Sequence, residues 1–271
     1  MQDMIEYRRK VGLVSKMQLA LMSVRDNGIL WFIFVGIYYV GSIMARFGLE
    51  KADALRRKKN LPGINSATAN KFVWENWDWS GKGDEWTISP EWKDSVVRNF
   101  IAPYFNQCGT VVEIGPGAGR WTEFLVTAAG SLIGIDISEA CVDECRKRFA
   151  KFPNARFETG NGRDIASVAA NSVDGIWSFD VFVHINRDEF SSYAAEFARV
   201  LKPGGIVVIQ HGSTGGSLRG NRGNVTTAQV YEFMRNNGLE VQEQVQTWRD
   251  GGGEYPAGLY GDTITIARKP S

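Results

Sequence analysis

Five residues in the middle of the chain have the types and spacing of a nucleotide-binding site. Glu113 ends an apolar run, and Gly115, Gly117 and Gly119 follow at alternate positions before a helical pattern begins. Glycines let the backbone turn sharply and approach a ligand closely. A second apolar run ends in Asp136, at the spacing where a carboxylate reaches the ribose hydroxyls of a bound nucleoside. Together these residues predict a cofactor that contains a nucleoside.

The chemistry of the glycine loop disfavours a nicotinamide dinucleotide. The dinucleotide fingerprint has a third glycine, which permits close helix packing, where this chain has Arg120. An acidic residue directly before the loop, Glu113, is a poor neighbour for a pyrophosphate but suits a cofactor with a cationic centre and an amino group. The loop therefore indicates S-adenosylmethionine.

Three motifs resemble those of class I methyltransferases, in the family's order: EIGPGAGR from Glu113, IGIDIS from Ile133, and LKPGG at 201–205. The resemblance implies an S-adenosylmethionine-dependent methyltransferase (EC 2.1.1.-) that binds methionine along the glycine backbone, ribose at Asp136, and adenine beside Asn161 and Gly162. Many family members carry Asp where Asn161 stands. The cofactor-binding set expected here is Glu113, Gly115, Gly117, Gly119, Arg120, Asp136, Ile137, Asn161 and Gly162.

A narrower likeness extends over nearly the whole chain. The segments NLPGINS, WENWDWS, DEWTISPEWK, EIGPGAGRWTEFL, WSFDVFVHI and GDTIT resemble bacterial methyltransferases associated with surface polysaccharide or glycolipid. This resemblance implies that the methyl acceptor is a glycan or glycolipid intermediate.

Methyl transfer to a hydroxyl needs a base beside the acceptor, and the chain has only two histidines. His184 follows the fourth predicted strand and His211 the fifth, so we expect both at the carboxyl edge of the sheet. An imidazole accepts a proton near neutral pH. We predict His211 as general base or acceptor-orienting group, His184 as its partner, and Asp180 as a third residue that holds the acceptor. Purely structural roles stay open for all three, including a loop cap at Asp180.

Other polar groups near this edge carry weaker signals. Arg219 or Arg222, in the loop after His211, would clamp an anionic acceptor such as a phosphate or uronate, and solvated surface charge is the alternative. No group of carboxylates, cysteines and histidines has metal-ligand spacing, so we predict no metal site.

The elements that position these residues alternate between apolar runs and helical patterns from residue 110 onward. The expected strands are Thr110–Ile114, Leu132–Asp136, Ala155–Thr159, Val173–Asp180, Gly205–Gln210, Leu239–Trp248 and Asp262–Ala267. The expected helices are Thr122–Ala129, Glu139–Phe149, Asp188–Val200 and Thr227–Asn237. This order predicts an α/β fold, a Rossmann-like, doubly wound, mostly parallel seven-stranded sheet with an antiparallel edge hairpin.

A tryptophan-rich segment precedes this domain. Residues 60–69 form a polar linker, and WENWDWSGKGDEWTISPEW follows it. One interpretation is that the tryptophans seal the open end of the domain. The other is an aromatic and carboxylate wall, with Asp78, Asp84 and Glu85, that stacks on and hydrogen-bonds a polar substrate such as a sugar. Ser89 and Pro90 are typical of the start of a helix that runs through Phe100.

The N-terminal part is a helical, partly apolar extension. Its first ~25 residues are basic and amphipathic, with Arg8, Arg9 and Lys10 among apolar residues. The next stretch, Ile29–Ala45, carries no charge but is shorter than the ~20 apolar residues that span a bilayer comfortably. Basic residues flank both of its ends, against the usual bias of a spanning helix. A short transmembrane helix, an interfacial or re-entrant anchor, and a helix docked on protein therefore remain alternatives.

Composition limits the remaining functions. Apolar residues form 44% of the chain, and 31 Lys and Arg nearly balance 30 Asp and Glu, so no charge excess favours a nucleic-acid partner. The three cysteines lack disulfide or zinc spacing. We expect a membrane-attaching extension (1–59), a linker with the tryptophan segment (60–92) and a methyltransferase domain (93–271).

The function expected from the whole sequence is O-methylation of a glycan or glycolipid intermediate by a cytoplasmic enzyme, peripheral on the inner face of the cell membrane. The first alternative acceptor is a lipophilic small molecule such as a quinone precursor. The second alternative is a non-catalytic, cofactor-binding scaffold, against which the intact glycine loop, Asp136 and the two histidines argue. The sequence does not determine the oligomeric state.

Overall fold

The computed structural model describes residues 13–59, 61, 63, 65–215 and 222–271. Arg8, Arg9, Lys10 and Arg219 lie outside these described residues. The chain divides into two compact units, Met1–Leu61 and Pro62–Ser271.

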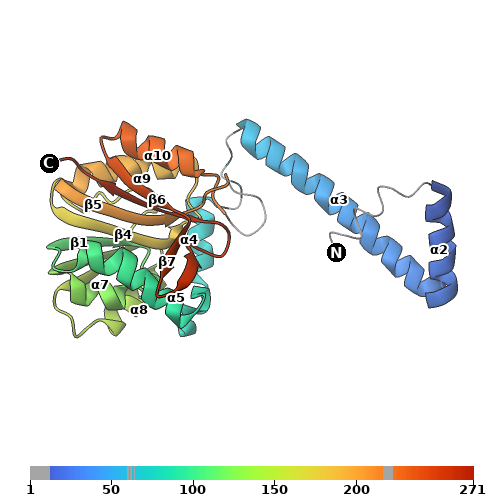
Figure 1. Cartoon of the computed structure of the whole chain (residues 1–271), viewed down its shortest axis with the longest axis horizontal. Coiled ribbons are helices and arrows are strands. Elements are labelled where there is room, and N and C mark those ends of the chain that lie inside the picture. The colour runs from blue at the N-terminus through green and yellow to red at the C-terminus, as the bar shows by residue number, and fades with distance from the viewer. Residues whose placement is uncertain (1–12, 60, 62, 64, 216–221) are drawn as a thin grey trace. The chain divides into compact units, whose positions relative to one another are not determined.

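Two helices form the described part of the first unit (Figure 1). Helix α2 spans Leu13–Asn27 and α3 spans Ile29–Lys59, with Gly28 between them at φ +84°. The apolar stretch of the sequence is thus the first half of a much longer helix. The part Ile29–Arg56 is long and apolar enough to cross a membrane, with a mean hydropathy of 1.7, and none of its apolar window is buried.

A seven-stranded sheet is the centre of the second unit. Its order is β3-β2-β1-β4-β5-β9-β6, and within this sheet β9 runs in the direction opposite to the other six strands. In the register of the parallel part, Val112 lies opposite both Ile133 and Ile176. The strands are β1 Thr110–Ile114, β2 Ser131–Asp136, β3 Ala155–Thr159, β4 Val173–Phe182, β5 Leu201–His211, β6 Glu240–Val245 and β9 Thr263–Arg268. The predicted mostly parallel sheet with an antiparallel edge is confirmed.

The antiparallel edge differs from the sequence prediction in one detail. The strand expected over Leu239–Trp248 is divided into β6 and β7 (Thr247–Asp250). Strand β7 pairs with β8 (Gly253–Pro256) in a separate two-stranded sheet, because the chain turns back at Gly251 and Gly252, both with positive φ. The hairpin-like pair β6 and β9 still closes the main sheet.

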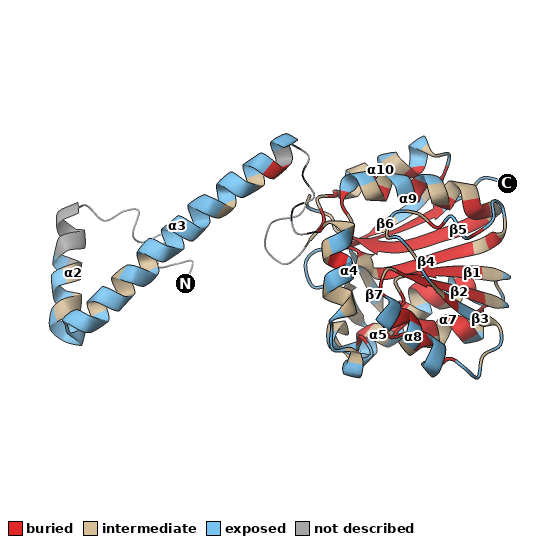
Figure 2. Ribbon diagram, turned by 180° about the vertical axis from the view of Figure 1, so that it is seen from behind, coloured by how far each residue is buried: buried red, intermediate tan, exposed pale blue. Residues whose placement is uncertain are grey.

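Helices cover both faces of the sheet (Figure 2). On one face α5, α7 and α8 pack over residues such as Trp177 and Val208; on the other α9 and α10 pack over Ile176, Val207 and Ile209. Alternate residues of a central strand thus enter opposite cores, as a strand buried on both sides requires. The helices are α7 Thr122–Ala128, α8 Glu139–Arg148, α9 Arg187–Val200 and α10 Thr227–Asn236.

The segment before the sheet contains more helix than the sequence indicated. Helix α4 (Ala67–Glu75) begins inside the predicted linker, capped by the Ser66 side chain. Two 3₁₀ turns follow, η1 (Trp79–Gly81) and η2 (Asp84–Trp86). The predicted helix start is confirmed: the Ser89 hydroxyl accepts the Trp92 N–H ahead of α5 (Pro90–Val96), which continues as the π-helical turn η3 (Val97–Ile101) and α6 (Ala102–Phe105).

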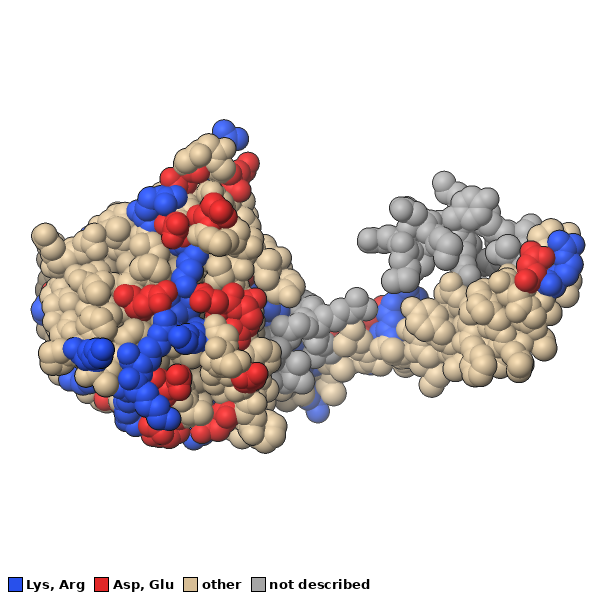
Figure 3. Space-filling view, turned by 90° about the horizontal axis from the view of Figure 1, so that it is seen from below, with Lys and Arg blue, Asp and Glu red and all other residues tan. Residues whose placement is uncertain are grey.

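Charges of both signs share the surface of this unit. On the face in Figure 3, Lys and Arg run beside Asp and Glu instead of forming a uniformly basic surface. A basic face that tracks phosphates would show positive charge alone.

Candidate functional site

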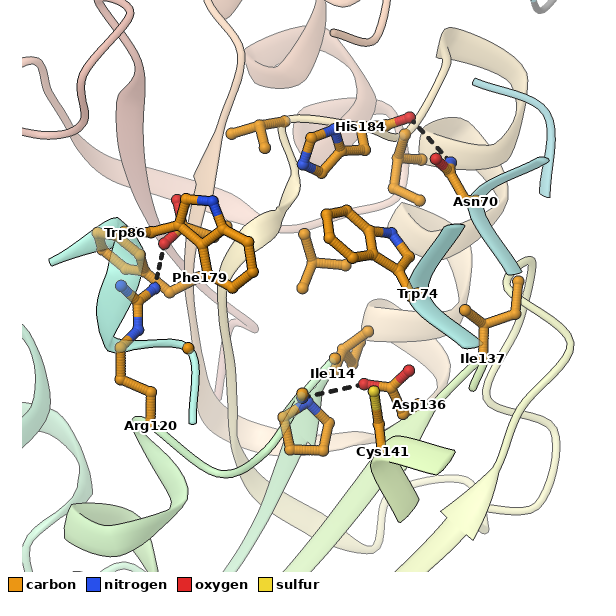
Figure 4. Close-up of a pocket in the computed structure, with 18 of the residues that line it drawn as sticks. Asn70, Trp74, Trp86, Ile114, Arg120, Asp136, Ile137, Cys141, Phe179 and His184 are labelled. Atoms are coloured by element: carbon orange, nitrogen blue, oxygen red, sulfur yellow. Dashed lines mark hydrogen bonds and ion pairs between the residues drawn. The ribbon is translucent and has the colours of Figure 1, made fainter. Parts of the chain in front are cut away.

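A cavity of about 330 Å³ opens at the carboxyl ends of β1, β2 and β4. Its walls come from the glycine loop after β1, the end of β2, the loops after β4 and β8, and the segment from α4 to α5. Asp136, Arg120, Trp74, Trp86 and His184 are grouped around it in Figure 4. This edge of a doubly wound sheet is where such folds bind nucleotides.

The glycine loop has the backbone that the sequence required. Gly115 and Gly117 adopt φ values of +69° and +56° and both line the cavity. A Cβ on Gly115 would lie 2.2 Å from Val181, and one on Gly117 would lie 3.0 Å from the ring of Trp79. Side chains are therefore disfavoured on this stretch of backbone, which lets a ligand approach the loop closely.

Asp136 lies at the end of β2, on the cavity wall. Its carboxylate accepts hydrogen bonds from the backbone N–H groups of Gly117 (3.0 Å) and Ser138 (2.9 Å). Burial raises the pKa of Asp136 to about 6, although these N–H groups act to lower it. The carboxylate is thus fixed beside the glycine loop and ionised at neutral pH, as a group that accepts hydrogen bonds from two ribose hydroxyls must be.

The expected adenine side of the site is partly present. Ile137 and Gly162 line the cavity and lie against each other, since a Cβ on Gly162 would come within 2.5 Å of the Ile137 Cδ1 atom. Asn161 does not line it. The Asn161 side chain is exposed and accepts the N–H groups of Arg163 and Asp164, which makes it a turn-forming residue.

Two other predicted cofactor contacts are also displaced from the cavity wall. Glu113 is buried, and its carboxyl group accepts the hydroxyl of Thr122 at 2.6 Å. Burial raises its pKa to about 8, so the group is protonated at neutral pH. Gly119 faces Phe149 of the α8 end, where a Cβ would come within 2.4 Å of the ring. The glycine thus permits helix packing, and neither Glu113 nor Gly119 lines the cavity.

Arg120 lines the cavity and forms an ion pair with Asp180. The guanidinium is 5% exposed and lies over the Trp121 ring, 4.8 Å from its centroid. Asp180 has φ +60°, an uncommon conformation for a residue other than glycine, and its N–H donates to the Gln210 amide oxygen at 2.8 Å. A strained residue held by its neighbours at a cavity wall is typical of functional sites.

A second ion pair, which the sequence did not indicate, closes the opposite part of the wall. Arg222 pairs with Asp262, and both line the cavity. The buried Gln210 amide connects the two pairs, because its nitrogen donates to Asp262 at 3.0 Å while its oxygen holds Asp180. Gln210 and Asp262 occupied predicted strands, where buried polar side chains among apolar neighbours were the available signal.

The two histidines have different environments. His184 lies in the loop after β4 and lines the cavity, with its ring centroid 5.2 Å from that of Trp74. His211 is fully buried in β5 and does not line the cavity. Its ring nitrogens lie 2.7 Å from the Gly212 carbonyl oxygen and the Thr265 hydroxyl, and burial lowers its pKa to about 4.

The prediction of His211 as general base is therefore withdrawn. Because side chains alternate between the two faces of a strand, His211 points from β5 into the buried core instead of into the cavity. His184 and Asp180 remain as candidates.

Four tryptophans form one aromatic cluster on the cavity wall. Trp74 has ring-centroid distances of 5.7–6.1 Å to Trp77, Trp79 and Trp86. The acidic residues of the same segment form hydrogen bonds with groups outside the cavity. Asp78 caps η1, Asp84 binds Lys93, and Glu85 accepts the Trp77 indole N–H. Of the predicted aromatic and carboxylate wall, the cavity thus contains the aromatic part only.

Within the described residues, no three His, Cys, Asp or Glu side chains are grouped so that they could hold a metal ion. The three cysteines are free, and Cys141 lies on the cavity wall.

Residues 111–205 match a family described as "Methyltransferase domain". A probable S-adenosylmethionine-dependent methyltransferase of Mycolicibacterium smegmatis is 29% identical over 137 residues, 51% of this chain and 50% of that protein. A demethylmenaquinone methyltransferase of Tropheryma whipplei is 32% identical over 99 residues, 36% of this chain and 40% of that protein. The chain thus spans half or less of the length of these relatives.

Solved structures share the fold at lower identity. The N-methyltransferase NodS from Bradyrhizobium japonicum, in complex with S-adenosyl-L-homocysteine, superposes with a TM-score of 0.59 at 16% identity. The match covers 76% of this chain and 99% of that one.

Proposed function

Residues 111–205 belong to an S-adenosylmethionine-dependent methyltransferase domain of class I, and from this premise we propose that the chain methylates a lipophilic acceptor at a membrane surface. The observation that carries the acceptor class is the lining of the cavity, where indole rings and aliphatic side chains predominate beside two ion pairs.

The described residues fit the cofactor. The loop at Gly115 and Gly117 has positive φ values and close neighbours that favour glycine, and Asp136 presents a fixed carboxylate beside it. Ile137 and Gly162 provide a flat apolar wall suited to a base. S-adenosylmethionine supplies an electrophilic methyl group on a sulfonium centre. Asp136 would hold its ribose, and the glycine backbone would lie along its amino-acid part.

The acceptor side of the cavity supports a lipophilic compound better than a free sugar. Polar substrates need several converging hydrogen-bond partners, since a buried polar group left unpaired costs about 1–3 kcal/mol. The carboxylates that would supply them, Asp78, Asp84 and Glu85, are engaged elsewhere. Ile88 and Val183 extend the aromatic wall with aliphatic surface. The relative from Tropheryma whipplei is named as acting on a demethylmenaquinone, which agrees with this class of acceptor.

His184 and Asp180 are the residues that we assign to the acceptor. Both line the cavity. Asp180 lies near the end of β4 with a positive φ, and His184 lies in the loop that follows β4. The His184 imidazole would accept the proton of an acceptor hydroxyl as the oxygen attacks the methyl group. Asp180, paired with Arg120, would orient that hydroxyl by accepting a hydrogen bond. Exclusion of water by the tryptophan cluster would favour the displacement over hydrolysis.

Helix α3 is the membrane-attaching element of this proposal. Among its exposed apolar side chains, Phe34, Ile37 and Met44 are 62–68% exposed. A soluble helix rarely leaves so much apolar surface in water. Lys58 and Lys59 at its end suit anionic head groups, so the proposed location is the inner face of the cell membrane.

The experiment is methyl transfer from cofactor labelled in its methyl group, with the full chain and a total extract of bacterial cells. The extract is then divided into lipid and water-soluble polysaccharide fractions. The proposal expects label in the lipid fraction, in material without sugar. Label confined to polysaccharide would refute it, and cofactor binding without any transfer would favour a scaffold.

A glycolipid intermediate is the second candidate acceptor. The observation that favours it is the indole surface of Trp74, Trp77 and Trp86, since aromatic faces also stack on sugar rings. Release of the label by acid hydrolysis as a methylated sugar would identify this acceptor.

A further inference from the structure

Trp79 lies directly against the glycine loop. Its ring atoms Cζ3 and Cη2 are 3.0 and 3.1 Å from the position that a Cβ on Gly117 would occupy. The indole N–H is engaged elsewhere, since it donates to the Trp74 carbonyl oxygen at 2.9 Å. The six-membered, all-carbon part of the ring is therefore the part that meets the loop. Trp79 brings π electrons, and no polar atom, to this stretch of backbone.

Two further indoles surround Trp79 at the cavity wall. Its ring centroid lies 6.1 Å from that of Trp74 and 5.8 Å from that of Trp86, at interplanar angles of 43° and 63°. All three residues line the cavity, and Trp74 and Trp86 are drawn with their rings toward it in Figure 4. Rings at such angles do not stack flat on one another, so part of their π surface is left for a ligand.

Core packing does not account for these indoles. The two buried hydrophobic cores of the second unit lie on the two faces of the sheet, and neither of them includes Trp74, Trp77, Trp79 or Trp86. The four rings pack on each other and on the cavity wall instead. Their place in the fold therefore points to a ligand.

The cavity has no unpaired carboxylate for a positively charged ligand. Of the described acidic residues on its wall, Asp180 is paired with Arg120, and Asp262 is paired with Arg222. Asp136 already accepts two backbone N–H groups and is assigned to the ribose. A cation in front of the glycine loop thus meets indoles where an acidic side chain would be expected. Aromatic faces attract cations, and tryptophan attracts them most strongly.

We propose that Trp79, supported by Trp74 and Trp86, binds the sulfonium centre of S-adenosylmethionine through its π electrons. This inference rests on the cofactor part of the proposed function, in which the amino-acid tail lies along the glycine backbone. It adds a cofactor-binding residue from outside the matched residues 111–205. The site then prefers the charged cofactor to S-adenosylhomocysteine, whose sulfur is a neutral thioether, and this preference favours product release.

The test compares three ligands that differ in charge at one position. S-adenosylmethionine has a sulfonium there, sinefungin has a carbon that carries an ammonium group, and S-adenosylhomocysteine is neutral. Calorimetry measures their dissociation constants for the full chain, for Trp79→Leu and for Trp79→Phe, which keeps an aromatic face. The matched control is Trp248→Leu, because Trp248 is partly buried like Trp79 but does not line the cavity.

We expect the wild type to bind the two cationic ligands about 5–30-fold more tightly than S-adenosylhomocysteine. Trp79→Leu should abolish this preference and change the affinity for S-adenosylhomocysteine by no more than about twofold. Trp79→Phe should keep part of the preference, and Trp248→Leu should keep all of it. Equal losses for the three ligands in Trp79→Leu would overturn the proposal, because the indole would then act by packing alone. A wild type without the preference would also overturn it.

Fluorinated tryptophan separates the effect of charge from that of shape. Fluorine withdraws π electrons from the ring with little change in its size, and all nine tryptophans can be replaced by analogues with increasing numbers of fluorine atoms. The affinity for S-adenosylmethionine should decrease stepwise, while that for S-adenosylhomocysteine stays constant. In Trp79→Phe the decrease should be smaller. An affinity for S-adenosylmethionine that does not depend on fluorination would contradict the proposal.

Failure of this inference and failure of the proposed function are distinguishable. Label in the lipid fraction, together with equal losses for the three ligands in Trp79→Leu, would refute the role of Trp79 alone. A preference for cationic ligands that Trp79→Leu abolishes, without any label in lipid, would refute the acceptor class and leave the role of Trp79 intact.

Discussion

The Arg120 guanidinium and the Asp180 carboxylate form an ion pair at the cavity wall, although sixty residues separate them along the chain. Arg120 follows the glycine loop and Asp180 lies near the end of β4, so the pair connects that loop to the strand at the cavity wall. Arg120 is 5% exposed and depends on this counterion, because burial of an unpaired charge is costly.

This relationship predicts strong coupling between the two residues. Asp180→Ala and Arg120→Met should each lower the free energy of unfolding, and the double variant should lose less than the two separate losses combined. We expect an interaction energy of about 1–3 kcal/mol in a double-mutant cycle measured by urea unfolding. Additive losses would show that the pair contributes nothing as a unit.

The two histidines should respond in opposite ways to substitution. His184→Ala should lower kcat by about 100-fold or more with little change in melting temperature, since the ring lies in the cavity. His211→Ala should cost about 2–4 kcal/mol of stability, through a lost buried hydrogen bond and a cavity, while the folded fraction keeps its kcat. Thermal unfolding and single-turnover methyl transfer separate the two outcomes. A large kcat effect at His211 would restore it to the mechanism.

Cofactor affinity should depend on the ionisation of Asp136. The pKa of Asp136 is raised to about 6 by burial, and only the carboxylate accepts two hydroxyl hydrogen bonds. The dissociation constant for S-adenosylhomocysteine should therefore be constant above pH 7 and increase up to about tenfold per pH unit below 6. Calorimetry from pH 5 to 8 measures this. An affinity that does not vary with pH would mean that Asp136 does not hold the ribose.

Glu113 should make the protein less stable at alkaline pH. Its folded pKa of about 8 exceeds the usual value of 4.5, so its stabilising contribution is complete below pH 4.5 and is lost progressively until the pH has risen through 8. Glu113→Gln keeps an acceptor for the Thr122 hydroxyl and does not ionise. The difference in melting temperature between the variant and wild type should grow in favour of the variant from pH 5 to 8 and become constant above pH 8. A difference that stays constant from pH 5 to 8 would contradict the assignment.

Most of the sheet was predictable because local patterns determine it. The bounds of β1 and β3 match the predicted ones, and those of α7 to α10 differ by one residue, since apolar periodicity and caps such as Ser138 decide where these elements start. The extent of α3 and the existence of α4 were not predictable in this way. Both continue through polar residues that a pattern based on apolar runs assigns to linkers.

The candidate site was predicted best where backbone conformation decides. Gly115 and Gly117 line the cavity with positive φ values that favour glycine, and Asp136 lies there at the end of a strand that the apolar pattern predicts. Roles that depend on where a side chain points were harder to predict from the sequence. His211 and Glu113 lie at the expected strand ends but turn inward, and the link from Asp180 through Gln210 to Asp262 joins residues distant in sequence.

The most direct test of the central claim is calorimetric titration of the full chain with S-adenosylhomocysteine, beside Asp136→Asn and the exposed-residue control Asn161→Ala. We predict binding at one site per chain, a loss of about 10–100-fold for Asp136→Asn, and unchanged affinity for Asn161→Ala. A wild-type chain that releases no heat with this ligand, or an Asp136→Asn variant that binds it equally well, would contradict the account.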